Sequence, residues 1–128
     1  MNDSELDSRD IARLLSAGRI VIGAAAWLAP RKFARSWTGH ELTGPAGTMA
    51  MRGLGIRDVA LGMGTLWALE GDGPARRWIE ASALADASDA ASVLMSWGQL
   101  SWPRRFISLA TAGTGCYLGV KSADSVDS

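Results

Sequence analysis

The sequence has few of the residues that build disulfides and metal sites, and it has no surplus of either charge. It contains one cysteine and one histidine. Cys116 has no internal disulfide partner and lies in an apolar run, where a free cysteine usually packs as a small apolar residue. A zinc site needs several such ligands, so we expect no metal and no cofactor, with a metal site made of carboxylates alone as a minor alternative. The 13 basic and 13 acidic residues cancel, which argues against a nucleic-acid partner.

Charged residues are also scarce in four long apolar segments, at about residues 11–29, 49–69, 78–97 and 106–120. The first three approach the ~20 residues that a helix needs to cross a bilayer. None shows the alternation of a half-buried strand. Proline and glycine separate the segments, beginning with Pro30, because proline cannot continue a helix interior. The sequence therefore predicts an all-α fold, a four-helix up-down transmembrane bundle.

This organisation predicts one membrane domain, residues 11–120, between a disordered acidic tail at 1–10 and a disordered tail at 121–128. Glycine and alanine are abundant in all four segments, and the spacing of Gly115 and Gly119 suits close approach of membrane helices. The loop after Pro30 contains a short amphipathic stretch, Phe33–Trp37, which we expect to lie on the membrane surface.

The six tryptophans lie at or beyond segment ends, where amphipathic rings favour the headgroup level of a bilayer. They are Trp27, Trp37, Trp67, Trp78, Trp97 and Trp102. Basic residues gather at the same boundaries, so we expect an integral, multi-pass protein of the cell membrane. An alternative is a soluble bundle with aromatic ends. The count of basic residues leaves the orientation undecided, with Arg31, Lys32, Arg35, Arg104 and Arg105 on one side and Arg9, Arg13, Arg76, Arg77 and Lys121 on the other.

Charged residues inside the segments oppose this interpretation, because each costs about 2.5–3.5 kcal/mol at the centre of a membrane helix. Segment 49–69 contains Arg52, Arg57 and Asp58. Such a helix must insert beside partners that neutralise its charges, and intramembrane charges of this kind often mark function. A soluble four-helix bundle and a membrane-surface protein therefore remain alternatives.

The depth of each charge in its segment predicts which charges meet. Arg19, Arg57 and Asp86 each lie about eight residues into a segment, near mid-span in an up-down bundle. Asp89 shares a helix face with Asp86. We expect Arg57 to bridge to Asp86 or Asp89, and Asp58 to face Arg19, in one buried charge network. In contrast, Arg13, Arg52 and Glu80 lie close enough to segment ends to reach the headgroups.

The five central charges sum to minus one, so one carboxylate is expected to hold a proton, since removal from water disfavours its charged form. Asp86 and Asp89 are therefore the candidates for acid catalysis, and Arg57 would orient the acid or bind an anion.

Two stretches, Arg52-Gly-Leu-Gly-Ile-Arg-Asp-Val-Ala-Leu-Gly62 and Ala83-Leu-Ala-Asp-Ala-Ser-Asp-Ala90, resemble the middle of small uncharacterised four-span membrane proteins common in actinobacteria. The Ala-Pro-Arg-Lys exit of the first segment is similar as well. The resemblance covers about residues 11–120 and implies a fold, but no activity.

Three functions fit these features. The first is an accessory or assembly protein of the membrane, in which the charges fix how helices associate. The second is a small membrane enzyme on a lipophilic substrate, of the acid-catalysed isomerase, cyclase or epoxide-opening type. The third is proton or small-solute transfer along the carboxylates. The expected partners are the lipid bilayer and either a lipophilic small molecule or a larger membrane protein, and the chain is compatible with a homo-oligomer.

Overall fold

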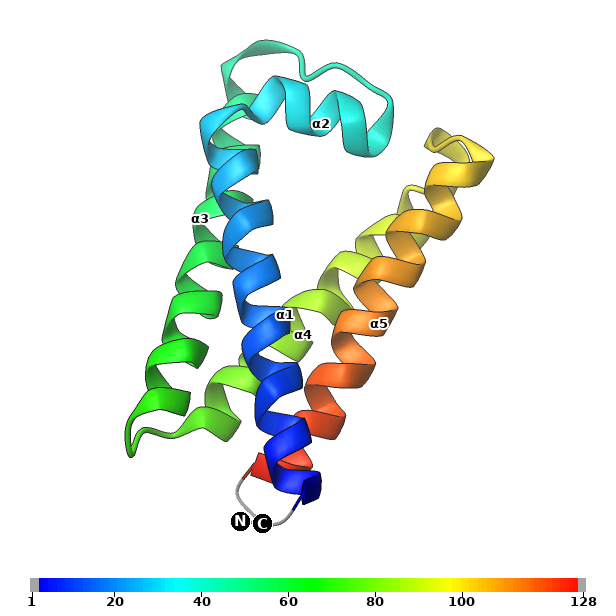
Figure 1. The fold of residues 1–128 in the computed structure, drawn as a ribbon. Helices are drawn as coiled ribbons and strands as arrows, with labels where there is room; N and C mark the ends of the chain where they lie inside the picture. The colour runs from blue at the N-terminus through cyan, green and yellow to red at the C-terminus, as the bar shows by residue number, and fades with distance from the viewer. Residues whose placement is uncertain (1–2, 127–128) are drawn as a thin grey trace.

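The computed structural model describes residues 3–126, and within them the chain is helical (Figure 1). The all-α expectation is confirmed, and residues 3–126 contain no strand. The α-helices are α1 Asp3–Leu28, α2 Pro30–Thr38, α3 Gly44–Glu70, α4 Ala75–Met95 and α5 Trp102–Val126, with a short 3-10 helix at Trp97–Gln99.

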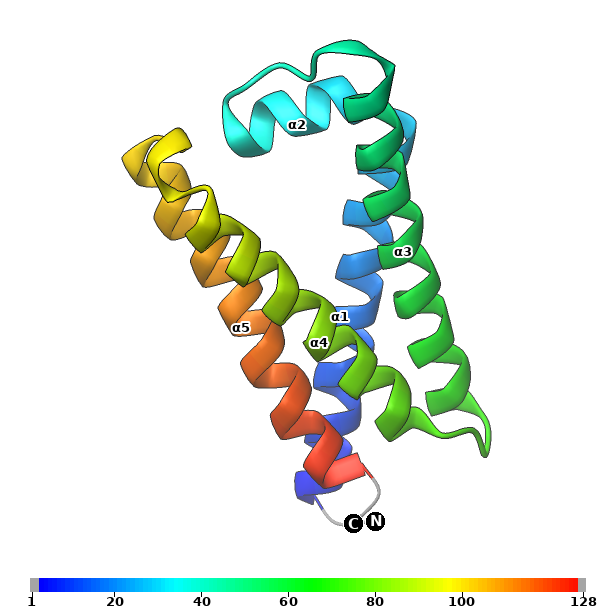
Figure 2. The same cartoon turned by 180° about the vertical axis from the view of Figure 1, so that it is seen from behind.

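The four long helices alternate in direction and form two antiparallel pairs, α1 with α3 and α4 with α5 (Figures 1 and 2). The two pairs lie close together near the chain termini and diverge toward the opposite end. There α2 runs across the end of the molecule and contacts α1, α3 and α5. The long helices thus form a splayed bundle rather than four parallel rods.

The helices are longer than the apolar segments that predicted them. Helix α5 has 25 residues, and α3 begins at Gly44 rather than at the first apolar residue. Helices α1 and α5 also extend into the two expected tails, of which residues 1–2 and 127–128 lie outside the described part. The physical reason is that a helix ends at a breaker, such as Pro30, rather than where its apolar run ends.

The interior is built from small side chains. The buried apolar residues are Ala12, Ala26, Ala34, Ala68, Leu69, Ala75, Ile79, Ala83, Ala85 and Ala123. Large apolar side chains point outward instead: Trp67 is 82% exposed, Met95 86% and Leu14 75%. This distribution is the reverse of that in a water-soluble core, where large aliphatic residues are the ones most often buried.

Glycines allow the helices within each pair to approach closely. A Cβ added to Gly55 of α3 would lie 2.5 Å from the carbonyl oxygen of Gly23 in α1, and one added to Gly23 would lie 2.5 Å from that of Gly55. In the second pair, a Cβ on Gly119 would lie 3.2 Å from the Cβ of Ala83. Small residues therefore set the helix spacing in both pairs.

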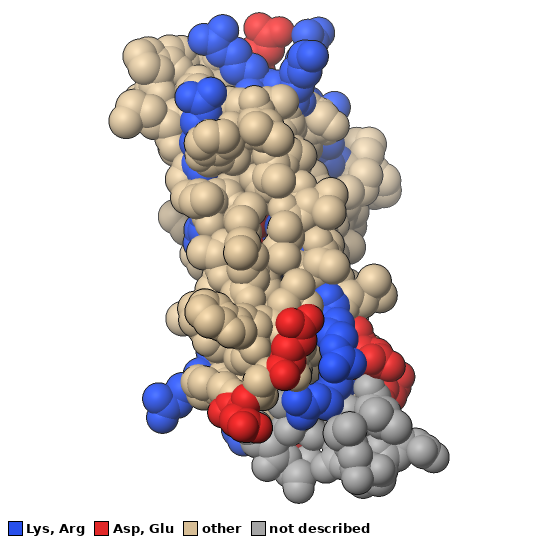
Figure 3. Space-filling model, turned by 60° about the vertical axis from the view of Figure 1, so that its left-hand side comes forward, with Lys and Arg blue, Asp and Glu red and all other residues tan. Residues whose placement is uncertain are grey.

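The six tryptophans lie near helix ends, and four of them are exposed: Trp27, Trp67, Trp78 and Trp102. Trp37 and Trp97 are half-buried. The face of the molecule in Figure 3 has its charged side chains at the two ends, with a broad band between them that is almost free of charge. Charged side chains and tryptophan rings thus gather at the same two ends of the molecule.

One helical segment in the described residues, Asp7–Leu28, is long and apolar enough to cross a membrane, and by itself this is weak evidence. The expectation of four such spans goes beyond this finding. Charged residues interrupt α3 and α4, while glycine, serine and threonine dilute the apolar character of α5. Whether these helices cross a bilayer depends on where their polar side chains lie.

Candidate functional site

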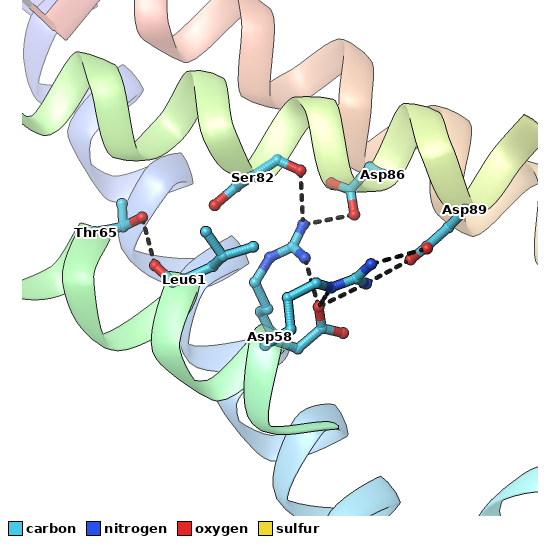
Figure 4. A network of polar contacts seen from close by, with 8 residues as sticks. Asp58, Leu61, Thr65, Ser82, Asp86 and Asp89 are labelled. Atoms are coloured by element: carbon cyan, nitrogen blue, oxygen red, sulfur yellow. Dashed lines mark hydrogen bonds and ion pairs between the residues drawn. The ribbon is translucent and has the colours of Figure 1, made fainter. Parts of the chain in front are cut away.

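Five charged side chains from α1, α3 and α4 meet in one place (Figure 4). At one end, Arg19 of α1 joins the two other helices. Its Nη1 donates to Asp58 Oδ1 of α3 at 3.1 Å, and its Nη2 donates to Asp86 of α4. The same Nη2 donates to the backbone oxygen of Ser82 at 3.3 Å. A single guanidinium therefore links three helices.

Arg57 of α3 holds the other end of the cluster. Its Nη1 and Nη2 donate to the two carboxylate oxygens of Asp89 at 3.2 and 2.9 Å, which is a two-pronged ion pair. Its Nε and Nη2 also donate to Asp58 Oδ1, at 3.1 and 2.9 Å. The charges thus alternate in sign from Asp89 through Arg57, Asp58 and Arg19 to Asp86. We call these five residues the ion network.

The ion network is partly exposed, which corrects the expectation of a buried network. The side chains of Arg19, Asp86 and Asp58 are 12%, 14% and 17% exposed, and those of Arg57 and Asp89 are 30% and 41% exposed. No charged side chain among those described is buried. The reason is the divergence of the two helix pairs, which places the network on the wall of a cleft instead of inside a closed core.

The sequence predicted only some of the ion pairs in the network. Asp58 faces Arg19, and of the two partners left open for Arg57 the structure selects Asp89. The link from Arg19 to Asp86 was not anticipated, because helical spacing places Asp86 and Asp89 on one face without showing that they reach different arginines.

The three residues expected near the helix ends lie outside the ion network. Arg13 pairs with Asp10 at 3.0 Å, and Glu80 with Arg76 at 2.8 Å. The guanidinium carbon of Arg52 lies 5.9 Å from the centroid of the Trp27 ring. None of these contacts involves the five network residues.

A partly open cleft of about 840 Å³ runs between the helix pairs, and all five network residues line it. Apolar side chains from α1, α3 and α4, including Ile22, Leu54 and Val93, form much of the remaining wall. Helix α2 adds Phe33 and Trp37 at the wide end. The cleft therefore combines an apolar surface with one localised group of charges.

Two contacts join the end of α2 and the loop after it to the opposite helix pair, and the sequence alone did not suggest them. His40 Nε2 lies 2.8 Å from the backbone oxygen of Gln99, which joins the loop after α2 to the 3-10 helix. The guanidinium of Arg104 packs on Gly39, where an added Cβ would lie 2.6 Å from Nη1. Gly39 has a φ of 80°, which is typical of a glycine that ends a helix. A glycine at this point of the sequence is the signal that could have marked the end of α2.

Asp86 and Asp89 differ in how many of their carboxylate oxygens the arginines bind. Both oxygens of Asp89 are held by Arg57. In Asp86 only Oδ1 takes part in the hydrogen bonds of the ion network, and Oδ2 faces Gly115 of α5, where an added Cβ would lie 2.6 Å away. Asp86 thus has an oxygen for proton transfer that Asp89 lacks. In the described part of the chain, no group of three potential ligands is placed to hold a metal ion.

The difference in exposure between Asp86 and Asp89 predicts unequal effects of the same substitution at the two positions. Asp86→Asn removes one of the two charges that neutralise Arg19, at a 14%-exposed position, whereas Asp89→Asn acts at a 41%-exposed position. We expect Asp86→Asn to lower the free energy of unfolding by about 2 kcal/mol and Asp89→Asn by under about 1 kcal/mol. Denaturant titration in mild detergent measures both, and a larger loss for Asp89→Asn would contradict this assignment.

No protein-family model, curated protein or solved structure matches the chain significantly.

Proposed function

We propose that the chain is an integral membrane protein that binds a lipophilic small molecule in the cleft between its two helix pairs. The observation that carries the proposal is the cleft itself, of about 840 Å³ with the ion network on its wall. Sites for small molecules usually have volumes of ~300–1,000 Å³, a mainly apolar lining and a few well-placed polar groups. Orientation of a bound ligand would then come from the ion network.

Three features support a bilayer as the surroundings of this cleft. The core is made of small residues while large apolar side chains face outward, as in membrane helices that pack through small residues. The four long helices have 26, 27, 21 and 25 residues, enough to cross the hydrocarbon core. Finally, the charges of α3 and α4 that would oppose insertion point toward one another in the cleft rather than toward lipid.

The same site supports acid-catalysed chemistry on its ligand. Asp86 would be the proton donor, because its Oδ2 lies outside the hydrogen bonds of the ion network. Arg19 would position that carboxyl group, while Arg57 and Asp89 hold each other. An isomerase, cyclase or epoxide-opening reaction is the enzymatic form of the proposal.

Two measurements test the proposal in sequence. Host membranes washed with alkaline carbonate should retain the protein, and its release would contradict integral insertion. A long-chain alcohol that carries a diazirine should then, on illumination, label residues that line the cleft, such as Val93 and Thr111. Peptide mass spectrometry locates the labelled positions.

A matched pair of variants shows whether the labelling reports the cleft. Thr111→Trp on α5 would fill it, since Thr111 lines the cleft. Val120→Trp places the same ring on an exposed position of α5 away from the cleft. We expect Thr111→Trp to reduce labelling several-fold and Val120→Trp to leave it unchanged. Equal labelling of both variants would mean that the probe reports the lipid-facing surface alone.

A second candidate function is that of an accessory or assembly protein, and the geometry of Arg19 favours it. One guanidinium contacts α3 and α4 from α1, so the ion network ties the two helix pairs together and can determine their register. In this case Asp86→Asn should reduce abundance without changing any bound ligand. Labelling of the cleft in wild-type protein separates the two functions.

A further inference from the structure

We infer that the ligand of the cleft is a lipophilic amine that binds in its positively charged ammonium form. The inference rests on the proposed binding function, since it names the chemical class of the molecule that the cleft would hold. It applies with Asp86 ionised, in place of the acid-catalysed form of the proposal in which Asp86 carries a proton. It follows from the charge balance of the ion network, from the free acceptor atoms around it, and from the direction in which the neighbouring hydroxyl groups donate.

The charge of the cleft is negative. Among the described residues that line it, Arg19, Arg57, Asp58, Asp86 and Asp89 carry formal charge, and two arginines against three aspartates sum to minus one. Each guanidinium already contacts two carboxylates. An anionic ligand would therefore meet arginines that are already neutralised, whereas a cation would complete the charge balance.

The free polar atoms are acceptors. Asp58 receives three hydrogen bonds from the arginines, all at Oδ1. Its Oδ2 lies outside the hydrogen bonds of the ion network, as does Asp86 Oδ2. A primary ammonium group has three donors and no acceptor. It is thus matched to two carboxylate oxygens of Asp58 and Asp86, the two aspartates that flank Arg19 in the alternating chain of charges.

Several of the hydroxyl groups that line the cleft also present acceptors rather than donors to a ligand. Each of five lining hydroxyls donates its only hydrogen to a backbone oxygen four residues earlier in its own helix, at 2.7 to 3.0 Å: Ser16, Thr65, Ser92, Thr111 and Ser122. A hydroxyl that has used its hydrogen retains its acceptor lone pairs. These side chains can therefore accept from a ligand without competing for its acceptors.

The rest of the cleft suits an alkyl or terpenoid chain. Its wall includes Leu15, Ile22, Leu54 and Val93, and it is partly open, so a long ligand could enter from the side of the bundle. Burial of an apolar chain contributes about 0.8 kcal/mol per methylene. The apolar wall would supply affinity, and the surplus negative charge would supply selectivity for the amine.

Competition among three ligands of equal chain length tests the inference on wild-type protein. The purified protein in nanodiscs is labelled with the long-chain diazirine alcohol, and dodecylamine, dodecanol and dodecanoate are added as competitors. Because a hydrogen bond to a charged group is stronger than a neutral one, we expect dodecylamine to compete at about tenfold lower concentration than dodecanol. Dodecanoate should compete least.

Variants connect this preference to the ion network. Asp86→Asn and Asp58→Asn should each abolish the preference for dodecylamine over dodecanol. Asp72→Asn makes the same chemical change in the exposed loop between α3 and α4 and should leave the preference intact. If one of the two network variants does not fold, the other variant and the competition on wild-type protein still show whether the ion network causes the preference for the amine.

The outcomes separate the inference from the proposed function. Equal competition by dodecylamine and dodecanol would overturn the inference that the ligand is an amine and would leave the cleft as a site for lipophilic molecules. This result is expected if a proton already neutralises the surplus negative charge. Stronger competition by dodecanoate would overturn it in favour of an anion. Absence of any cleft labelling would overturn the proposed function too. A short-chain phosphatidylethanolamine added as a fourth competitor identifies the source of the ammonium, because competition by this lipid alone would mean a headgroup rather than a free amine.

Discussion

Replacement of Arg19 by leucine is expected to destabilise the protein more than any other single change in the ion network. Arg19 is 12% exposed and neutralises Asp58 and Asp86. Its loss would leave two carboxylates of like charge close together on two helices, and removal of one partner from a well-shielded ion pair costs about 3–5 kcal/mol. We expect a loss of about 3 kcal/mol in the free energy of unfolding, measured by denaturant titration in detergent, with a corresponding fall in abundance.

Two further variants isolate the charge from the side-chain volume. Arg13→Leu removes an arginine from the same helix at a 47%-exposed position, where it pairs with Asp10, and its effect should stay within about 0.5 kcal/mol. The double variant Arg19→Leu/Asp86→Leu removes one charge of each sign and should recover more than half of the lost stability. If the double variant is less stable than Arg19→Leu alone, the coupling between these residues is not the ion pair that we describe.

Replacement of Gly55 by leucine is the second change for which we expect a large effect. The Cβ alone would lie 2.5 Å from the backbone oxygen of Gly23 and 2.8 Å from the backbone nitrogen of Trp27. Since both contacts are to backbone, a rotamer change cannot relieve them and α1 must move away from α3. Overpacking of this kind costs about 3 kcal/mol. It would also draw Asp58 away from Arg19, because Asp58 follows Gly55 by one helical turn.

The same helix provides the control. Gly53 has no heavy atom within 4 Å of an added Cβ, so Gly53→Leu changes helix propensity without a clash and should be neutral or stabilising by up to about 1 kcal/mol. Gly23→Leu should reproduce the loss seen for Gly55→Leu, because it obstructs the same crossing from the other side. Equal melting temperatures for the Gly53 and Gly55 variants would show that α1 and α3 do not approach this closely.

The helices themselves could be read from local features of the sequence. Pro30 and the Gly71-Asp-Gly-Pro74 turn separate apolar segments of helical length, and these signals act over a few residues. The depth of Arg19, Arg57 and Asp86 in their segments also sufficed to place them at one level, since rise per residue is a constant of the helix. The ends of α3 and α5 could not be read in this way, because polar residues continue a helix as readily as apolar ones.

Local features of the chain predict an all-helical protein whose charged side chains lie at similar depths in their helices, because helix formation and helical rise are local properties. The divergence of the two helix pairs comes from tertiary packing, in which glycines such as Gly23 and Gly55 meet across the helices of one pair. Such meetings join residues far apart in the chain, so no local pattern reveals them. The packing of the two helix pairs places Arg19 within reach of both Asp58 and Asp86, and it places the charges on the wall of an open cleft instead of in a closed core.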